Sequence, residues 1–417
     1  MNNHSKTRVA VLGGARTPFA RAGTLFKDRS ALQLAAHSIE GLLAKHPFDP
    51  ETAVLAYGIV IVDPRTPHFA REVVFRSPLP SSVRAVTVTD NCITSLSAME
   101  HVHGALVAGR ADAGIAGGVE CMSNPPLLFG ETASRIFRDA GLARSGAERI
   151  RCLGRLRPRH FKPQPPAITE PSTGLTMGEH CEIMVKEWRI PRETQDAVAH
   201  RSQVNAGAAT DDGRLPAEIH PLDGLERDPI IRADTTLERL AQLRPAFDRS
   251  ALGTITAGNS SPLTDGAAAV LLMSEARARR EGREPLAFIK AFEFAGIDPA
   301  EGLLMGPALA VPRLLRKTGL SLANMDIVEM HEAFAGQVAC NLRAWEQGWK
   351  EPAIGGVPEE RLNPLGSSIA VGHPFAATGA RIVTTLANEM QRRDARYGLV
   401  SICGAGATAG ALILERT

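Results

Sequence analysis

The stretch Thr87-Val-Thr-Asp-Asn-Cys-Ile-Thr-Ser-Leu-Ser-Ala98 joins two segments of different periodicity. The residues before it, from 83 to 89, are mostly β-branched or apolar, which indicates a buried strand. After it, apolar residues recur at helical spacing as far as Val107. Asp90 and Asn91 are favourable N-cap residues, so Cys92 is expected at or next to the N-terminus of that helix.

A cysteine at this position is a candidate nucleophile. Unpaired N–H groups and the positive end of the helix dipole favour a thiolate over a thiol, and the thiolate is the reactive form. The alternative is that Cys92 is a small buried hydrophobic residue, because free cysteines are among the most buried residue types. The catalytic interpretation therefore needs a histidine partner from elsewhere in the chain.

Composition narrows the class of protein. The chain has 417 residues, 44% of them apolar and 22% charged, which is typical of a soluble protein of two or three domains. A net charge of +2 gives no indication of nucleic-acid binding. No apolar run approaches the ~18 residues of a membrane span. The N-terminus has neither the apolar core nor the cleavage site of a signal peptide, so we expect a cytoplasmic protein.

The six cysteines are sparse and no two have CxxC spacing, which argues against a disulfide scaffold and against a metal site. Strand-like and helix-like segments alternate, which predicts an α/β fold with a mostly parallel sheet. The expected strands lie at 8–12, 54–62, 83–89, 113–119, 267–273, 287–292, 326–330 and 398–403, with an amphipathic helix at 32–43.

Residues from about 123 to 253 break this alternation. Proline, arginine and short helical pieces, among them 177–186 and 192–202, indicate an insertion lying over the α/β core. Seven basic residues and one acidic residue lie between Arg144 and Lys162. This run is either a solvated surface loop or a patch that attracts an anionic ligand such as a phosphorylated cofactor.

The C-terminal region repeats the pattern around Cys92. His373-Pro374 opens a helix that runs to about Arg392, followed by a strand that ends at Cys403. We interpret the two regions as copies of one α/β unit, which would place both helix starts at one interface. With Pro374 at N1, His373 should stay neutral and able to accept a proton from a thiol, although a structural core histidine is the alternative.

Two further residues complete the candidate site. Cys403 precedes Gly404–Gly410, but the spacing is not GxGxxG and too few residues follow for a dinucleotide-binding unit. His331 follows a strand and leads into a helix, where it could donate a hydrogen bond, hold a water molecule or serve only a structural role.

These blocks together resemble the thiolase family, and the match follows the family's order along nearly the whole chain. Histidine at position 331, rather than asparagine, resembles the long-chain 3-ketoacyl-CoA thiolases, including the β-subunits of fatty-acid-oxidation multienzyme complexes. The matching blocks are Ala15–Pro18, Asn91-Cys92, Gly117–Glu120, Arg155–Arg159, Ser172–Gly178, Thr256–Ser261, Asp265–Ala268, His331–Ala335, Gly372–Pro374, Thr378–Arg381 and Cys403 with its tail of small residues.

The resemblance implies a fold of two duplicated βαβαβαββ halves in a five-layer α/β/α/β/α core. One half would comprise residues 1–122 and 254–277, and the other residues 278–417. Residues 123–253 would form an inserted loop domain that covers coenzyme A. The family resemblance also implies a homodimer or homotetramer, and its branch a possible hydratase/dehydrogenase subunit as partner.

The implied chemistry uses two thiols. Cys92, activated by His373, would attack the 3-keto carbon of a 3-ketoacyl-CoA, and Cys403 would protonate the departing acetyl-CoA carbanion. Coenzyme A, a co-substrate rather than a bound cofactor, would then release the shortened acyl-CoA. One oxyanion hole would use His373 and a water at His331, and the other the backbone N–H groups of Cys92 and Ala405.

Residues expected to bind coenzyme A or substrate by resemblance are Met177, Ala257, Ser261 and Phe334. The chain departs from the family at Ala376-Ala377 and at Ala407-Thr408-Ala409, where glycines are common. If the backbone there needs positive φ, alanine costs energy or shifts the loop.

Cleavage of 3-ketoacyl-CoA in fatty-acid β-oxidation is the favoured function, with acetoacetyl-CoA synthesis as the enzymatic alternative. A degenerate thiolase that binds acyl-CoA or lipid without turnover is an alternative of another class, and retention of both thiols and His373 argues against it. A ketosynthase-like enzyme is disfavoured because its chemistry has no use for Cys403.

Overall fold

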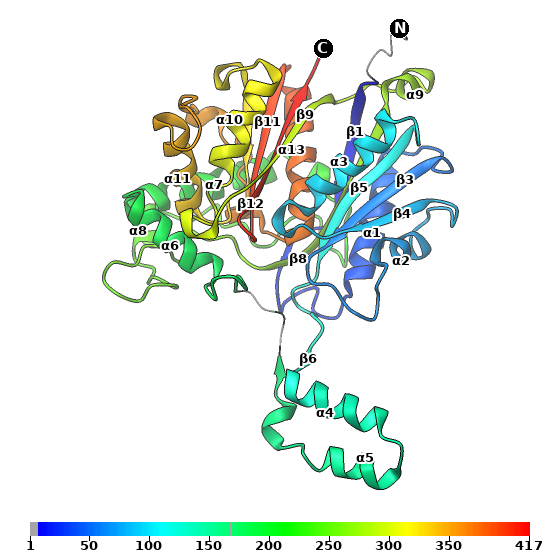
Figure 1. Ribbon diagram of the computed structural model, residues 1–417. Coiled ribbons are helices and arrows are strands. Elements are labelled where there is room, and N and C mark those ends of the chain that lie inside the picture. The colour runs from blue at the N-terminus through cyan, green and yellow to red at the C-terminus, as the bar shows by residue number, and fades with distance from the viewer. Residues whose placement is uncertain (1–6, 165, 167–168) are drawn as a thin grey trace.

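One ten-stranded sheet, whose two halves have matching strand orders, forms the body of the protein (Figure 1). The computed structural model describes residues 7–164, 166 and 169–417. Residues 1–6, which the signal-peptide interpretation included, lie outside them. The N-terminal half has the strand order β1-β8-β5-β3-β4, and the C-terminal half has the order β9-β12-β11-β10. The strands are β1 (Val9–Arg16), β2 (Ala20–Arg21), β3 (Ala53–Ile59), β4 (Arg84–Val88), β5 (Ala113–Glu120), β8 (Thr264–Ser274), β9 (Ala287–Gly296), β10 (Ile327–Met330), β11 (Tyr397–Gly404) and β12 (Thr408–Glu415).

The predicted duplication is confirmed by strand direction as well as order. β8 runs antiparallel to β1 and β5, and β12 runs antiparallel to β9 and β11. β3 is parallel to β5, as β10 is to β11. In the C-terminal half, a single parallel bridge between Val328 and Leu362 stands where β4 pairs with β3 in the other half. Two residue pairs between β1 and β9 join the halves.

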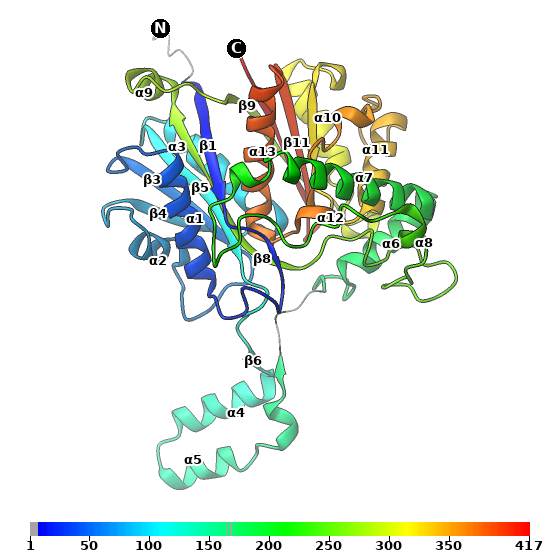
Figure 2. The ribbon, with the colours of Figure 1, turned by 180° about the vertical axis from the view of Figure 1, so that it is seen from behind.

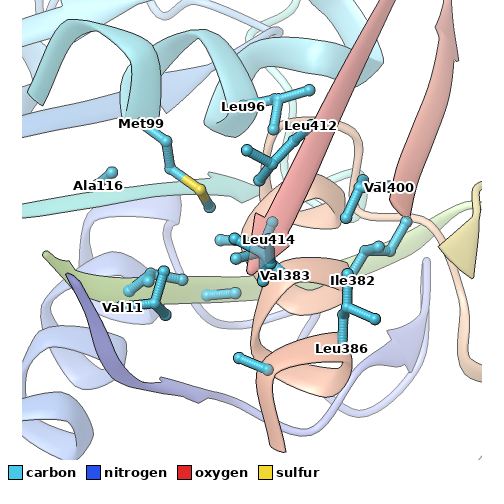
Figure 3. Close-up of a cluster of buried hydrophobic side chains, with 14 of the residues drawn as sticks. Val11, Leu96, Met99, Ala116, Ile382, Val383, Leu386, Val400, Leu412 and Leu414 are labelled. Carbon is cyan, nitrogen blue, oxygen red and sulfur yellow. The ribbon is translucent and has the colours of Figure 1, made fainter. Parts of the chain in front are cut away.

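Helices α3 (Thr94–Val107) and α13 (Thr378–Arg392) lie between the two halves of the sheet and form the central layer (Figure 3). Their apolar side chains pack against inward-facing residues of both halves, such as Val11 and Leu412. Because side chains alternate along a strand, the opposite faces pack against outer helices. These are α1 (Ala31–Lys45) and α2 (Phe69–Arg76) on one side, and α10 (Pro307–Thr318) and α11 (Ala335–Gln347) on the other. The expected five-layer α/β/α/β/α core is therefore present.

The start of each central helix differs from the prediction. A 3-10 turn, Asn91–Ile93, precedes α3, and no side chain caps that helix. The Asp90 carboxylate instead accepts a hydrogen bond from Ser97 Oγ at 2.6 Å. Pro374 is not at N1 of the long helix either, since a second 3-10 turn, Phe375–Ala377, precedes α13. Cys92 thus lies next to the helix N-terminus, as expected, but within a 3-10 turn. The expected side-chain cap of α3 and the expected position of Pro374 at N1 of α13 are wrong, because a tight turn precedes each regular helix.

The segment between β5 and β8 has two parts (Figure 2). Helices α6 (Met177–Glu187), α7 (Arg192–Asp211) and α8 (Leu237–Ala241) lie beside the C-terminal half. An arm made of β6 (Leu128–Phe129), α4 (Glu131–Leu142), α5 (Gly146–Leu153) and β7 (Pro163–Gln164) projects away from the body and carries the basic run. That this run covers coenzyme A stays a prediction.

Short elements complete the chain: α9 (Glu275–Arg280), α12 (Ser368–Val371) and 3-10 turns at Pro158–Phe161, Pro216–Glu218, Pro299–Glu301, Leu322–Asn324 and Glu359–Arg361. Among the described residues, no helix combines the length and hydropathy needed to cross a membrane.

Candidate active site

Cys92 and His373 meet although they are 281 residues apart in sequence. The distance between Cys92 Sγ and His373 Nε2 is 3.1 Å, and His373 Nδ1 lies 2.6 Å from Thr378 Oγ1. The close approach of α3 and α13 makes this possible, because a side chain at Gly379 would lie within 2.8 Å of Ser95 Oγ. The two turns predicted to carry function thus face each other in the central layer.

Both partners are uncharged in the free protein. Cys92 is only half-buried as a whole residue, yet desolvation around its sulfur raises the pKa of the thiol to about 12, against the N–H groups of Ala405 and of Cys92 itself. Burial, with a smaller contribution from Arg381, lowers the pKa of His373 to about 3. The expectation that the helix start stabilises a thiolate is therefore wrong. His373 is neutral as expected, but burial rather than a helix dipole is the cause.

Cys403 lies near the end of β11 with only 1% of its surface exposed. Burial raises the pKa of its thiol well above the usual range, and proximity to Cys92 adds to the effect. Cys403 belongs to an apolar cluster that includes Phe334, with Met177 and Phe247 packed against it. The second thiol is therefore held protonated beside the first, at the edge of an apolar region.

The loop after Cys403 is tied to the turn that carries Cys92. Asn91 Nδ2 donates to the backbone oxygen of Ala405 at 2.8 Å, and the N–H of Ala405 is directed at Cys92 Sγ. Asn91 adopts φ of +47°, a left-handed conformation that asparagine tolerates. The structure thus places both backbone N–H groups predicted for one oxyanion hole, those of Cys92 and Ala405, at the sulfur.

The departures from the family pattern have unequal consequences. Ala407 has φ of +55°, which costs a non-glycine residue about 1–2 kcal/mol. By contrast, Ala377 has φ of −82°, and Ala376 is not among the described residues with positive φ. The backbone strain anticipated from sequence is therefore confined to the tail after Cys403.

His331 completes the cluster, and its imidazole is fully buried. Its ring centroid is 4.1 Å from that of His373. One ligand-type atom each from Cys92, His331 and His373 all lie within 4.8 Å of one another. Burial, with smaller contributions from His373 and Arg381, holds the pKa of His331 well below its usual value. Thiolate and imidazole are also donors that zinc accepts, so these three atoms have the composition of a partial metal site.

The residues predicted to bind coenzyme A differ in how far they are buried. Met177 begins α6 and Phe334 precedes α11, and both contact the apolar cluster around Cys403. Ser261 is half-buried and donates its backbone N–H to Ala333 O at 2.9 Å, whereas Ala257 is exposed. Their roles in binding stay predictions.

Sequence reasoning missed two residues of this site. Phe247 packs edge-on against Phe334 with ring centroids 5.8 Å apart, and the only sequence signal was its being one of few aromatic residues. Ser368 contacts His331, but nothing in the local pattern around it indicated a role.

Comparisons with known proteins agree with this geometry. Residues 9–276 match the family model "Thiolase, N-terminal domain", and residues 283–416 match "Thiolase, C-terminal domain". The chain is 42% identical to a 3-ketoacyl-CoA thiolase of Klebsiella pneumoniae, covering 98% of this chain and 97% of the relative. A 3-ketoacyl-CoA thiolase of Escherichia coli is 41% identical with the same coverage.

Two solved structures have the same fold. The Bacillus anthracis acetyl-CoA acetyltransferase superposes with a TM-score of 0.85 at 30% identity, covering 98% of this chain and 99% of that one. The human mitochondrial 3-ketoacyl-CoA thiolase gives a TM-score of 0.84 at 29% identity, with 99% of both chains covered. These enzymes therefore share the fold of this chain, and the two family models together with the full-length relatives show that the chain belongs to the thiolase family.

Proposed function

We propose that the protein is a 3-ketoacyl-CoA thiolase, an acetyl-CoA C-acyltransferase of fatty-acid β-oxidation. The observation that carries this proposal is the 3.1 Å contact between Cys92 Sγ and His373 Nε2, with Cys403 buried beside it. The names of the full-length relatives support the same activity. Coenzyme A and acyl-CoA are the substrates, and no bound cofactor is required.

In the first half-reaction, His373 Nε2 takes the proton of Cys92 as the sulfur attacks the 3-keto carbon. Proton transfer has to accompany attack because both groups are neutral beforehand. Covalent catalysis then divides a difficult carbon–carbon cleavage into two easier steps. The oxygen of the tetrahedral adduct develops negative charge, which fixed hydrogen-bond donors stabilise.

Collapse of the adduct breaks the Cα–Cβ bond and leaves the acyl group on Cys92. The electron pair of that bond passes to the departing acetyl-CoA carbanion, which Cys403 protonates. In the second half-reaction, the thiol of coenzyme A gives its proton to the Cys403 thiolate and its sulfur attacks the acyl-enzyme. The bond from the acyl carbon to Cys92 Sγ breaks, the shortened acyl-CoA is released, and Cys92 takes its proton back from His373. The high pKa of Cys403 suits this role, because a protonated thiol is available to donate.

Acetoacetyl-CoA synthesis is the second candidate, favoured by the likeness to the Bacillus anthracis acetyl-CoA acetyltransferase. The same residues would run the reaction in reverse, with Cys403 removing a proton from acetyl-CoA. Thiolysis rates across acyl chain lengths separate the two functions. A chain-length optimum beyond four carbons supports β-oxidation, whereas activity restricted to acetoacetyl-CoA supports synthesis.

Two substitutions test the mechanism itself. Cys92→Ala should abolish the acyl-enzyme adduct detected by intact mass spectrometry, and a persisting adduct would place the nucleophile elsewhere. Cys403→Ala should still become acylated by an activated thioester but should lose Cα–Cβ cleavage. Unchanged cleavage would remove Cys403 from the mechanism. A chain that binds acyl-CoA but forms no adduct at all would be the non-catalytic alternative.

We also propose a cytoplasmic homodimer or homotetramer, with a hydratase/dehydrogenase subunit as a possible partner. The family membership and the branch resemblance at His331 support this assignment. Light scattering of the purified chain measures the oligomeric state, and the same measurement with such a subunit added tests whether the two proteins associate.

A further inference from the structure

The neutral imidazole of His331 carries a single ring proton, and two ring nitrogens compete for it. His331 Nδ1 lies 2.8 Å from Ser368 Oγ. His331 Nε2 is buried and has no hydrogen-bond partner among the described residues. Which nitrogen carries the proton decides whether His331 can donate or only accept at the site.

Arg381 determines the direction of the hydrogen bond at Nδ1. Its Nη2 lies 3.0 Å from Ser368 Oγ and 3.2 Å from Ser367 Oγ. A guanidinium can only donate hydrogen bonds, so the Ser368 oxygen accepts from Arg381. The Ser368 oxygen could accept a second hydrogen bond, but its buried hydroxyl hydrogen would then have no acceptor among the described residues, so that hydrogen is directed to His331 Nδ1. Nδ1 is therefore the acceptor, and the ring proton lies on Nε2.

We propose that Arg381 and Ser368 are positioning residues that hold His331 in the tautomer whose Nε2–H donates into the Cys92–His373 site. This inference deepens the proposed thiolase function and rests on it for its catalytic consequence. The donated hydrogen bond would stabilise an oxygen that becomes negative during the reaction, directly or through a water molecule. The tautomer itself follows from the hydrogen bonds, whatever the substrate.

The two neighbouring imidazoles would then have opposite tautomers. For His373 to accept the Cys92 proton at Nε2, its own ring proton must be on Nδ1, donating to Thr378 Oγ1 at 2.6 Å. His331 receives a hydrogen bond at Nδ1 and donates at Nε2. His373 acts as a base and His331 as a hydrogen-bond donor because different hydroxyl groups contact their Nδ1 atoms. The Thr378 hydroxyl accepts from His373, whereas the Ser368 hydroxyl, which accepts from Arg381, donates to His331.

The surroundings of Arg381 explain how a cation is tolerated in the core, where only 1% of its surface is exposed. Burial lowers the pKa of Arg381, and the neighbouring acidic groups of Glu329, Glu218 and Glu332 oppose that effect. Glu329 lies on β10, two residues before His331. Arginine stays charged under such conditions, which keeps Ser368 an acceptor at every pH of interest.

Three variants test the proposal kinetically. Ser368→Ala removes the hydroxyl that fixes His331, and we expect kcat for thiolysis to fall about 10- to 100-fold with little change in KM. Ser367→Ala is the matched control, because this serine is also buried and also accepts from Arg381 but does not contact His331. Ser368→Thr keeps the hydroxyl and should recover most of the lost rate. Equal losses in the two alanine variants, or no loss in Ser368→Ala, would overturn the positioning role.

A spectroscopic measurement tests the tautomer without relying on activity. With ¹⁵N-labelled histidine, NMR distinguishes a protonated ring nitrogen from a bare one, and the His331→Asn and His373→Asn variants assign the two sets of signals. We expect His331 to be protonated at Nε2 in the wild-type chain and to lose this uniform state in Ser368→Ala but not in Ser367→Ala. Protonation of His331 at Nδ1 in the wild type would refute the inference. Failure of thiolysis alongside the expected tautomer would instead refute the proposed function.

Discussion

Gly118 on β5 offers a steric test of how the sheet positions the catalytic turn. A Cβ atom built at this glycine would lie 2.1 Å from the backbone oxygen of Ala376 and 2.5 Å from its carbonyl carbon. Favourable contacts between non-bonded heavy atoms need roughly 3.5 Å. The substitution Gly118→Ala therefore requires the turn containing Ala376 to move by about 1 Å or more, because the obstacle is backbone and cannot rotate away.

This movement should reach the active site. Ala376 is only three residues beyond His373, whose Nε2 is 3.1 Å from Cys92 Sγ. A shift of about 1 Å takes that pair beyond normal hydrogen-bond distance, and misplacement on this scale can cost about 100-fold in rate. Overpacking of a close-packed interior should also lower the free energy of unfolding by about 1–3 kcal/mol.

The rate of acyl-enzyme formation, followed by stopped-flow mixing and mass spectrometry, measures the first effect, and denaturant unfolding measures the second. Gly104→Ala is the matched control, since Gly104 lies on α3 and the added Cβ would meet no described atom within 4 Å beyond its chain neighbours and the adjoining backbone of its own helix. It should leave acylation unchanged and add about 0.5–1 kcal/mol of stability. If Gly118→Ala acylates as fast as Gly104→Ala, the link between the sheet and the catalytic turn is refuted.

Two other properties of the site can be checked. Because the pKa of Cys92 is raised to about 12, its alkylation by iodoacetamide should increase steadily from pH 7 to pH 9, as the thiolate fraction grows. A plateau below pH 8 would show a preformed thiolate instead. The Asn91–Ala405 hydrogen bond should also matter, so Asn91→Gly and Asn91→Ala should both slow acylation about tenfold, by misplacing the Ala405 N–H. The melting temperature of Asn91→Ala should be lower than that of Asn91→Gly, because alanine disfavours the φ of +47° at this position and glycine does not. Equal melting temperatures of the two variants would contradict the strain argument.

Local pattern was sufficient to find the elements and the reactive residue types. The alternation of strand-like and helix-like segments predicted the strands, and residue type at the start of a helix or the end of a strand marked Cys92, His373 and Cys403 as candidates. The repeat of one α/β unit was also visible, because both copies must bury the same faces and so keep the same order of strand, turn and helix.

Local pattern failed where long-range contacts override it. Asp90 and Asn91 have the composition of a helix cap, yet Asp90 bonds Ser97 and Asn91 reaches Ala405, since tertiary partners compete for the same polar groups. The prediction that Cys92 is a thiolate was wrong for a related reason. A helix start lowers a thiol pKa, but desolvation between two packed halves outweighs that effect, and sequence does not show how deeply a residue is buried.

The sequence by itself determined the fold class, the duplication and the residues able to do thiol chemistry, because these follow from periodicity and residue type. Only the tertiary structure decided that Cys92 and His373 are neutral and in contact, and that Arg381, through Ser368, orients His331. The physical reason is that hydrogen-bond direction and desolvation depend on which distant groups pack together. Those neighbours are set by the docking of the two halves around α3 and α13, not by any local stretch of the chain.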